Sequence, residues 1–275
     1  MANTVSAGFE TQWATEVKLQ FQQGASKLRP FVRLVTGITG DTYKFPTLEA
    51  FAANTKSRNA DLTYIEPQHA VKTATMTNHY APVLIDDLDV VKQNADLRKY
   101  YIENTAAAIG RQFDKLIIAA LDASNTAITT TNGAFSMAKL LQALRKLNAS
   151  NVPSGERVIV ISSQELEVAL GETKLTSADY QTMRALVSGE ISSALGAKWV
   201  VFDEAMLSID TATTPDVRKC YVFNKNAVGA AINKDIMTTV ERIAHKDATQ
   251  VLTKMSAGAV VIEATGNIQI LCDIS

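Results

Sequence analysis

The chain has 275 residues, of which 47% are hydrophobic and 20% are charged, and its formal net charge is −1. This length allows one elaborated domain or two smaller ones, and the near-neutral charge excludes a general attraction to nucleic acid or anionic lipid. No apolar run is long enough to span a bilayer, and the first residues lack the basic and apolar regions of a signal peptide.

The first 39 residues predict an N-terminal arm. Four large apolar side chains recur at i+4 spacing and predict an amphipathic helix from about Phe9 to Gln22: Phe9, Trp13, Val17 and Phe21. Gly24 is expected to end it, and an extended segment follows because Pro30 disfavours helical geometry at Arg29.

The arm is locally basic, with cations at Lys18, Lys27, Arg29 and Arg33. They could contact phosphates or an acidic partner surface. The alternative is a solvated helix face with ion pairs between subunits. We favour the second, because aromatic residues for base stacking are not interleaved with the cations.

Residues 40–80 predict a long β-hairpin. One strand begins at Thr42–Phe45 and is limited by Pro46, and Ala70–Met76 alternates as a second strand. The segment between them is polar and rich in turn residues. An isolated two-stranded hairpin is marginal in water, so we expect this one to lie on another surface, most simply a neighbouring subunit. A flexible surface loop is the alternative.

A long amphipathic helix is expected from about Asn94 to Leu121, within a segment 81–135. One face of it carries Leu97, Tyr101, Ile102, Ala106, Ile109, Phe113, Leu116, Ile117 and Ala120. The stretch of about 25 residues from Leu97 to Leu121 would be roughly 38 Å long. The acidic residues that precede it are Asp86, Asp87 and Asp89. A hard cation could use them, but they are explained more simply as helix caps and dipole partners.

Residues 136–223 alternate between helix and strand, which predicts a compact α/β subdomain. The expected helices are Met137–Leu147, one that starts at the capping box of Ser162 and Glu165 and ends at Gly171, and a shorter one over Ala178–Leu195. The expected buried strands are Arg157–Ile161 and Lys198–Phe202.

Residues 224–275 are mostly strand. Five strand-like segments follow one another from Cys220, with Gly258 and Gly266 as breaks: CYVFN, MTTVERIAH, TQVLTKM, AVVIEA and NIQILCDI. In the last strand, alternate residues are expected to point to one side of the sheet and the residues between them to the other. The first set is Ile268, Ile270, Cys272 and Ile274.

No catalytic, cofactor-binding or metal site is predicted. His69, His79 and His245 have no partner at the spacing of a known motif, and each is interpreted as an interface or surface residue. Cys220 and Cys272 lie far apart in apolar sequence and are expected to be buried, reduced thiols. Phosphate-loop, nucleophile-elbow and dinucleotide-binding motifs do not occur.

The order of these elements resembles the major capsid proteins of tailed bacteriophages, which have the Hong Kong 97-type fold. The matching residues are EVKLQFQQGASKLRPFVR in the arm, the hairpin from Gly40, HYAPVLIDDLD, and AIGRQFDKLIIAAL in the long helix. The resemblance covers the first half of the chain by sequence and the second half by the order of elements.

The resemblance implies an α+β fold with an N-terminal arm (1–39), an extended hairpin loop (40–80), a peripheral domain with a spine helix (81–135), an axial α/β domain (136–223), and return strands of the peripheral domain (224–275). It also implies a shell protein, not an enzyme, that assembles as pentamers and hexamers around double-stranded DNA in a virion made in the bacterial cytoplasm.

The implied partners are further copies of the chain, a portal protein, decoration proteins in some members, and packaged DNA bound without sequence specificity, with no membrane. Because the chain begins directly with the arm, a separate scaffolding protein is expected. Two other functions stay open from the sequence: the shell of an encapsulin-like compartment around a cargo enzyme, and a small α/β enzyme built on residues 136–223.

Overall fold

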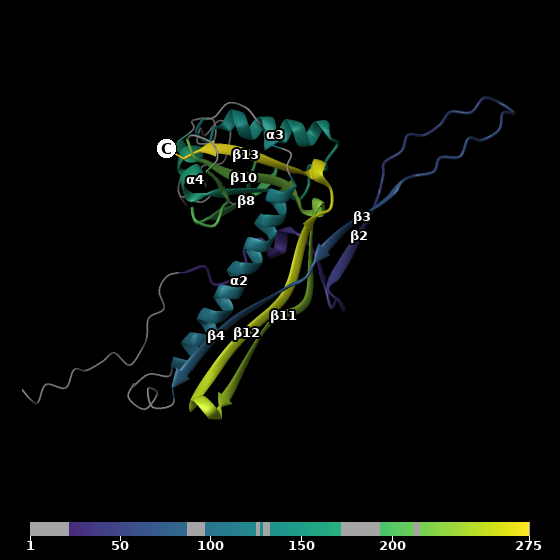
Figure 1. Cartoon of the computed structure of the whole chain (residues 1–275). Coiled ribbons are helices and arrows are strands. Elements are labelled where there is room, and N and C mark those ends of the chain that lie inside the picture. The colour runs from purple at the N-terminus through teal and green to yellow at the C-terminus, as the bar shows by residue number, and fades with distance from the viewer. Residues whose placement is uncertain are drawn as a thin grey trace, which may run out of the picture. The chain divides into compact units, whose positions relative to one another are not determined.

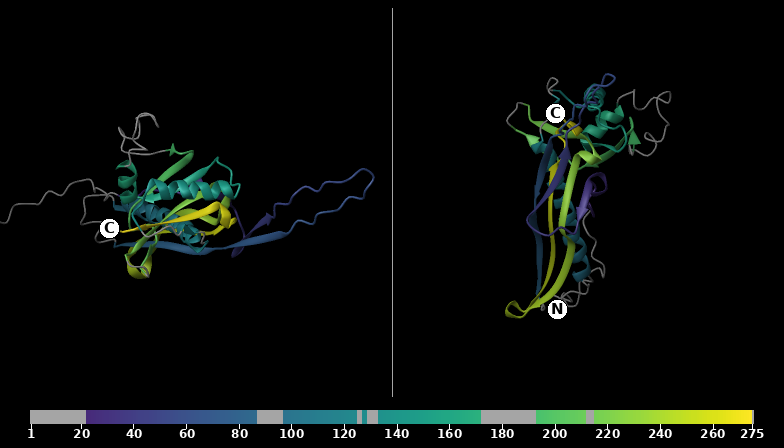
Figure 2. Two further views of the ribbon diagram at one scale, coloured as in Figure 1. Left: turned by 90° about the horizontal axis from the view of Figure 1, so that it is seen from above. Right: turned by 90° about the vertical axis from the view of Figure 1, so that its right-hand side faces the viewer.

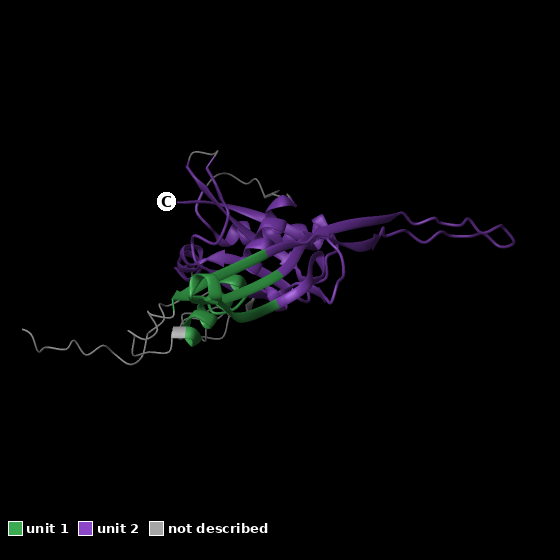
Figure 3. Ribbon diagram, turned by 60° about the horizontal axis from the view of Figure 1, so that its bottom comes forward, with its two compact units in different colours: residues 1–26, 79–111, 236–255 green, residues 27–78, 112–235, 256–275 purple. Residues whose placement is uncertain are grey.

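The computed structural model describes residues 22–86, 97–124, 127–128, 133–171, 193–211 and 215–274 (Figure 1). The chain forms two compact units (Figure 3). Unit 1 comprises residues 1–26, 79–111 and 236–255, and unit 2 comprises residues 27–78, 112–235 and 256–275. The helix α2, Leu97–Ala123, and the strands β11, Val228–Ile243, and β12, Ala248–Val261, each contribute residues to both units.

Unit 2 contains a seven-stranded sheet whose order is β5-β13-β10-β6-β8-β7, with β9 paired to β10. The strands are β5 Ala127–Ile128, β6 Arg157–Ser162, β7 Ser193–Ala194, β8 Ala197–Phe202, β9 Ile209–Asp210, β10 Val217–Asn224 and β13 Asn267–Asp273. All six residues of β6 are buried, as a strand in the centre of a covered sheet should be. The helices α3, Met137–Ala149, and α4, Ser163–Gly171, belong to the same unit (Figure 1).

A second sheet has the order β1-β11-β12-β4, with β1 at Arg33–Thr36 and β4 at Thr77–Asp86. β1 is parallel to β11. In unit 1, the hydroxyl of Thr105 on α2 lies 2.8 Å from that of Thr253, which lies 2.8 Å from that of Thr238. The side of the sheet that carries Thr253 and Thr238 therefore faces the helix in this unit.

The third sheet is the hairpin of β2, Thr42–Leu48, and β3, His69–Thr75. Its distal part stands clear of the rest of unit 2 in two different views (Figures 1 and 2). Short 3-10 turns complete the chain: η1 Arg29–Phe31, η2 Lys225–Ala227, η3 Ala244–Lys246 and η4 Ala264–Gly266. None of the described helices is long and apolar enough to cross a membrane.

Most predicted elements are confirmed with small shifts of their ends. The long helix begins at Leu97, and residues 94–96 lie outside the described part of the chain. The predicted arm helix also lies outside it, apart from Gln22. Pro46 falls inside β2 and faces Val71, in a two-stranded sheet whose strands are both edges.

Two predictions about strands are wrong. Gly258 does not separate two strands, because it lies inside the continuous β12, and β11 begins at Val228 rather than Met237. In β13 both faces are buried from Asn267 to Ile270, so the alternate facing expected from the sequence does not appear there as alternate burial. The predicted helix Ala178–Leu195 lies mostly outside the described residues, and its last residues form β7 and a turn.

Candidate assembly surfaces

The base of the β2–β3 hairpin is fixed in the core of unit 2. Phe45 on β2 and Ala74 on β3 lie on the same face of the hairpin, and each is 1% exposed. They pack in a cluster with Ile38, Ala231 and Ile262. The ring of Tyr43 meets that of Phe45 edge-on, with 4.8 Å between the centroids. The sequence signal for this anchor is the pair of aromatic residues at the start of β2.

Two glycines let the hairpin approach the second sheet closely. A Cβ on Gly229 would lie 2.7 Å from the Phe45 ring, and a Cβ on Gly258 would lie 2.2 Å from the carbonyl oxygen of Thr75. Next to Gly258, the Thr77 hydroxyl donates a hydrogen bond of 3.2 Å to the carbonyl of Ala257. Gly258 is therefore a site of close backbone contact within a strand.

Beyond its base the hairpin is covered by none of the residues that the structure describes. All residues from Glu49 to Glu66 are exposed, including large apolar side chains. Phe51 is 60% exposed, Leu62 is 64% and Tyr64 is 88%. Three large apolar side chains exposed on one segment suit a surface that packs against another molecule. This arrangement, a buried root and a bare distal part, fits a segment that packs against another molecule.

A second anchored segment is the stretch that follows the predicted arm helix. The carboxylate of Asp114 in α2, which is fully buried, accepts hydrogen bonds from the backbone N–H groups of Lys27 at 2.9 Å and Leu28 at 3.1 Å. The Leu28 side chain is also fully buried. The buried carboxylate thus holds the start of this segment on the helix.

One turn earlier, in unit 1, the same segment lies against the helix backbone. A Cβ on Gly110 would lie 3.2 Å from the backbone nitrogen of Ser26, so a larger residue would push the segment away. Arg111 donates hydrogen bonds to the Gln22 side chain at 2.8 Å and to the Gln23 carbonyl at 3.0 Å. We call residues 22–28 with their contacts to Gly110, Arg111 and Asp114 the arm anchor.

The structure places two of the four predicted arm cations in contacts within unit 2. Arg29 binds Asp235 through two hydrogen bonds of 3.0 and 2.6 Å, and its pKa is raised by that carboxylate. The Lys27 ammonium donates to the Val201 carbonyl at 2.8 Å and lies 5.3 Å from the centre of the Phe202 ring. These two cations therefore have partners within their own chain, and pairing between subunits stays a prediction. Arg33 is exposed, and Lys18 lies outside the described residues.

The other residues considered for chemistry lie on separate elements. Asp86 is exposed at the end of β4, whereas Asp87 and Asp89 fall outside the described residues. His69 begins β3 and His245 lies in η3, and both are exposed. His79 on β4 is half-buried, and partial burial lowers its pKa.

The two cysteines, distant in sequence, come together on neighbouring strands β10 and β13. They are free, buried thiols, and their sulfur atoms and a Glu165 carboxylate oxygen lie within 4.8 Å of one another. This donor set fits a metal poorly. Arg218 already occupies Glu165 through a buried ion pair of 3.1 Å, and the Cys272 thiol, burial and Glu165 together raise the pKa of Cys220 well above its ordinary value, which keeps the thiol protonated.

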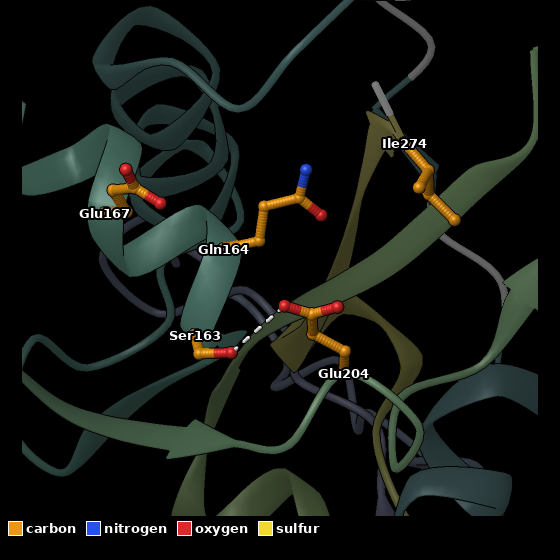
Figure 4. Close-up of a pocket in the computed structure, with 5 residues that line it drawn as sticks. All are labelled: Ser163, Gln164, Glu167, Glu204 and Ile274. Carbon is orange, nitrogen blue, oxygen red and sulfur yellow. Dashed lines mark hydrogen bonds between the residues drawn. The ribbon is translucent and has the colours of Figure 1, made fainter.

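An open, polar depression of about 380 Å³ lies at the start of α4. Its lining residues are Ser163, Gln164, Glu167, Glu204 and Ile274, and the Ser163 hydroxyl donates a 3.4 Å hydrogen bond to Glu204 (Figure 4). This lining supplies carboxylates, an amide and a hydroxyl but no histidine, cysteine or lysine to act with them. It gives no argument for catalysis.

Nearly the whole chain matches a known protein family. A family model described as phage capsid protein matches residues 5–274. The chain belongs to this phage capsid protein family. Among curated protein sequences none matches it.

Solved capsid structures share the fold of this capsid protein. A chain of Mycobacterium phage Che8 has a TM-score of 0.78 and 19% identity, covering 96% of this chain and 97% of that one. The capsid of cyanophage P-SCSP1u also gives 0.78 and 19%, covering 97% and 94%. The cyanophage Pam1 capsid gives 0.77 and 12%, covering 99% of each. The α+β, Hong Kong 97-type capsid fold predicted from the sequence is confirmed.

Two sequence blocks that carried the resemblance contact each other in this capsid protein. QQGASKLR contains residues 22–28 of the arm anchor, and AIGRQFD contains Gly110, Arg111 and Asp114. Both blocks are apparent in the sequence, but the roles of Gly110 and Asp114 become clear only in the structure. The signal was present: a glycine and a carboxylate stand within an otherwise apolar helix face.

Proposed function

We propose that this chain is the major capsid protein of a tailed bacteriophage, which assembles as pentamers and hexamers into an icosahedral shell around double-stranded DNA. The observation that carries the proposal is the hairpin, whose base is fixed in unit 2 while residues 49–66 are exposed. A shell subunit needs segments that cover its neighbours, and large interfaces then supply the stability that such segments lack alone.

In this proposal the chain has five regions: an N-terminal arm (1–39), an extended loop (40–80), a peripheral domain with the spine helix α2 (81–135), an axial domain (136–223) and the return strands (224–275). The arm anchor sets where the arm leaves the spine. A separate scaffolding protein and a portal protein assist assembly in the host cytoplasm, and the product is a structural protein without enzymatic activity.

The test removes the tip of the hairpin, Asn54–Asp61. The deleted residues are all exposed, so the subunit should stay soluble and folded by circular dichroism. Negative-stain microscopy of the full chain, alone or with its scaffolding protein, should show shells for the wild type and few or none for the deletion. A variant in which glycine and serine replace the same residues keeps the length and separates loss of side chains from loss of reach.

A wild-type chain that stays monomeric under all assembly conditions would contradict the proposal. Loss of global folding in the deletion would show instead that the tip belongs to the subunit core.

A further inference from the structure

One side of β8 in the seven-stranded sheet is left open by the other strands. β8 is parallel to β6 along its whole length, Ala197–Phe202. On its other side β8 pairs with the two-residue strand β7, which reaches only as far as Lys198. Beyond Lys198, no strand in the described part of the chain lies on this side. We call this side, from Trp199 to Phe202, the β8 edge.

The β8 edge presents backbone groups that could pair with another strand. The turn between β7 and β8 has positive φ at both central residues, Leu195 and Gly196, so the flanking Ala194 and Ala197 exchange backbone hydrogen bonds. Backbone groups of successive strand residues point alternately to the two sides. Val201, four positions after Ala197, therefore directs both its N–H and its carbonyl away from β6, toward the edge.

Side chains from the end of the arm cover this edge. The Lys27 ammonium donates a 2.8 Å hydrogen bond to the Val201 carbonyl and lies 5.3 Å from the centre of the Phe202 ring. Four residues later, the Phe31 ring has the Lys198 ammonium 5.5 Å from its centre. Each of the two segments thus places a lysine on an aromatic ring of the other, which is a favourable contact in both directions.

The covering segment, residues 27–31, is held at both ends, and we call it the strap. At its start, the buried carboxylate of Asp114 accepts the N–H groups of Lys27 and Leu28. Soon after its end the chain enters β1, which pairs with β11. The strap is therefore fixed independently of its contacts with β8, and those contacts are made by side chains that the fixed backbone brings to the edge.

The sequence of the strap prevents it from becoming a further strand of the sheet. Pro30 has no N–H group to donate. Residues 29–31 form the turn η1, in which the Phe31 N–H donates to the Leu28 carbonyl at 2.9 Å. A turn does not supply the repeated donors and acceptors of a strand ladder, so the sheet ends here. Lysine at an edge is one of the means by which natural proteins prevent pairing between sheets of different molecules.

We propose that the strap is an edge guard, which prevents the β8 edge from pairing with the β8 edge of a second copy of this chain. The edge is complementary to itself, because Val201 offers both a donor and an acceptor. Two such edges meet antiparallel about a two-fold axis. This inference goes beyond the proposed function, because it concerns a contact that free subunits must avoid rather than a contact in the shell.

The first experiment removes the ammonium that caps Val201. It compares Lys27→Ala with Lys115→Ala, an exposed lysine on α2, in the full chain at concentrations below those that give shells. Sedimentation should show Lys27→Ala self-associating at a concentration about ten-fold lower than the wild type, because the edge is uncovered. Lys115→Ala should behave like the wild type, and so should Lys27→Arg, which keeps a cation with N–H donors.

The second experiment blocks the edge itself. Proline at position 201 removes an N–H group that points away from β6, and proline on an edge strand disfavours pairing with another chain. The double variant Lys27→Ala with Val201→Pro should therefore return to the self-association of the wild type. The matched variant Lys27→Ala with Val201→Ala should keep the added self-association. If Lys27 served only stability, proline would not reverse the effect of its loss.

Hydrogen exchange provides a measurement that does not depend on the proline variant folding. As the concentration of the Lys27→Ala subunit rises, exchange should slow in the peptide that contains Val201, because its N–H becomes paired. Exchange in α3, Met137–Ala149, should not change with concentration.

Equal self-association of Lys27→Ala and the wild type would overturn the edge guard, as would equal self-association of Lys27→Ala and Lys115→Ala. So would unchanged exchange at Val201 in associated subunits, or self-association that persists in a folded double variant with proline. These outcomes leave the proposed function standing, because they are measured on unassembled subunits. A wild-type chain that forms no shells under assembly conditions would refute the proposed function and leave the edge guard unaffected.

Discussion

Replacing Asp114 by alanine tests the arm anchor. In the wild type the buried carboxylate accepts the N–H groups of Lys27 and Leu28, at 2.9 and 3.1 Å. Alanine removes both acceptors and leaves two backbone donors without these partners beside a buried helix face. The chain can then keep the segment in place with unsatisfied donors, or release it into solvent.

The two outcomes have similar magnitudes. A hydrogen bond to a charged group contributes about 1.5–3 kcal/mol, so the loss of two gives about 3–6 kcal/mol. Release of the segment instead exposes Leu28 and Val32, which are 0% and 2% exposed. Full burial of such side chains is worth about 1.5–3 kcal/mol each, which again sums to about 3–6 kcal/mol. This loss is a large share of a typical domain stability of about 5–15 kcal/mol, so it should be readily measurable.

Urea unfolding of the unassembled subunit measures this loss, and trypsin distinguishes the two outcomes. If the segment is released, cleavage after Lys27 should become faster while the rest of the subunit resists. The control Asp114→Asn keeps one oxygen acceptor and should lose less stability than Asp114→Ala. An Asp114→Ala subunit within about 0.5 kcal/mol of the wild type, with unchanged cleavage, would refute the role assigned to this carboxylate.

Three further changes probe the core and one histidine. Phe113→Asp should prevent the subunit from folding, because Phe113 is 2% exposed and an unpaired buried carboxylate costs more than about 4 kcal/mol. Circular dichroism measures the folding, and Lys115→Asp on the exposed side of the same helix is the control. Gly258→Ala should lower the free energy of unfolding by about 1–3 kcal/mol, because its Cβ would lie 2.2 Å from the Thr75 oxygen, and a normal thermal midpoint would contradict this contact. Burial lowers the pKa of His79 in the folded state. The stability that His79 contributes is therefore present above the unfolded pKa of about 6.5 and is lost as the pH falls through the lower folded pKa. His79→Gln should flatten that part of the plot of unfolding free energy against pH.

Local chemistry was enough to predict most elements of the fold. The apolar period of α2 and the buried run Arg157–Ile161 are properties of short stretches, and both are confirmed. The capping box is confirmed as well: the Ser162 N–H donates to Glu165 at 3.1 Å, and the Gln164 N–H donates to the Ser162 hydroxyl at 3.2 Å. Such signals depend only on residues within a few positions of one another.

What could not be predicted depends on contacts between distant residues. Gly258 was read as a break because glycine weakens a strand locally, yet its role is set by the Thr75 carbonyl on another strand. The meeting of Cys220 and Cys272 follows from the register of β10 and β13, which no local pattern specifies. The sequence also gives no way to place the Lys27 ammonium on the Val201 carbonyl.

The arm anchor lies between these two cases, because its residues break local rules visibly. A glycine inside a helix costs about 1 kcal/mol relative to alanine, and a carboxylate on a buried face needs partners. Gly110 and Asp114 break these rules four positions apart, on the same side of α2. A second segment must therefore come close to the backbone there and supply N–H donors, which Ser26, Lys27 and Leu28 do.

The arm anchor and the hairpin are attached to the subunit in the same way. Each is held strongly at its root, by Asp114 in one case and by Phe45 and Gly258 in the other. Beyond its root the hairpin exposes apolar side chains that contribute little to the stability of the single chain. Burial of Phe51 or Leu62 on a neighbour would be worth at most about 1.5–3 kcal/mol each, too little for a stable pair. In a closed shell each subunit makes such contacts with several neighbours at once, so weak contacts that would be reversible in a pair become collectively stable.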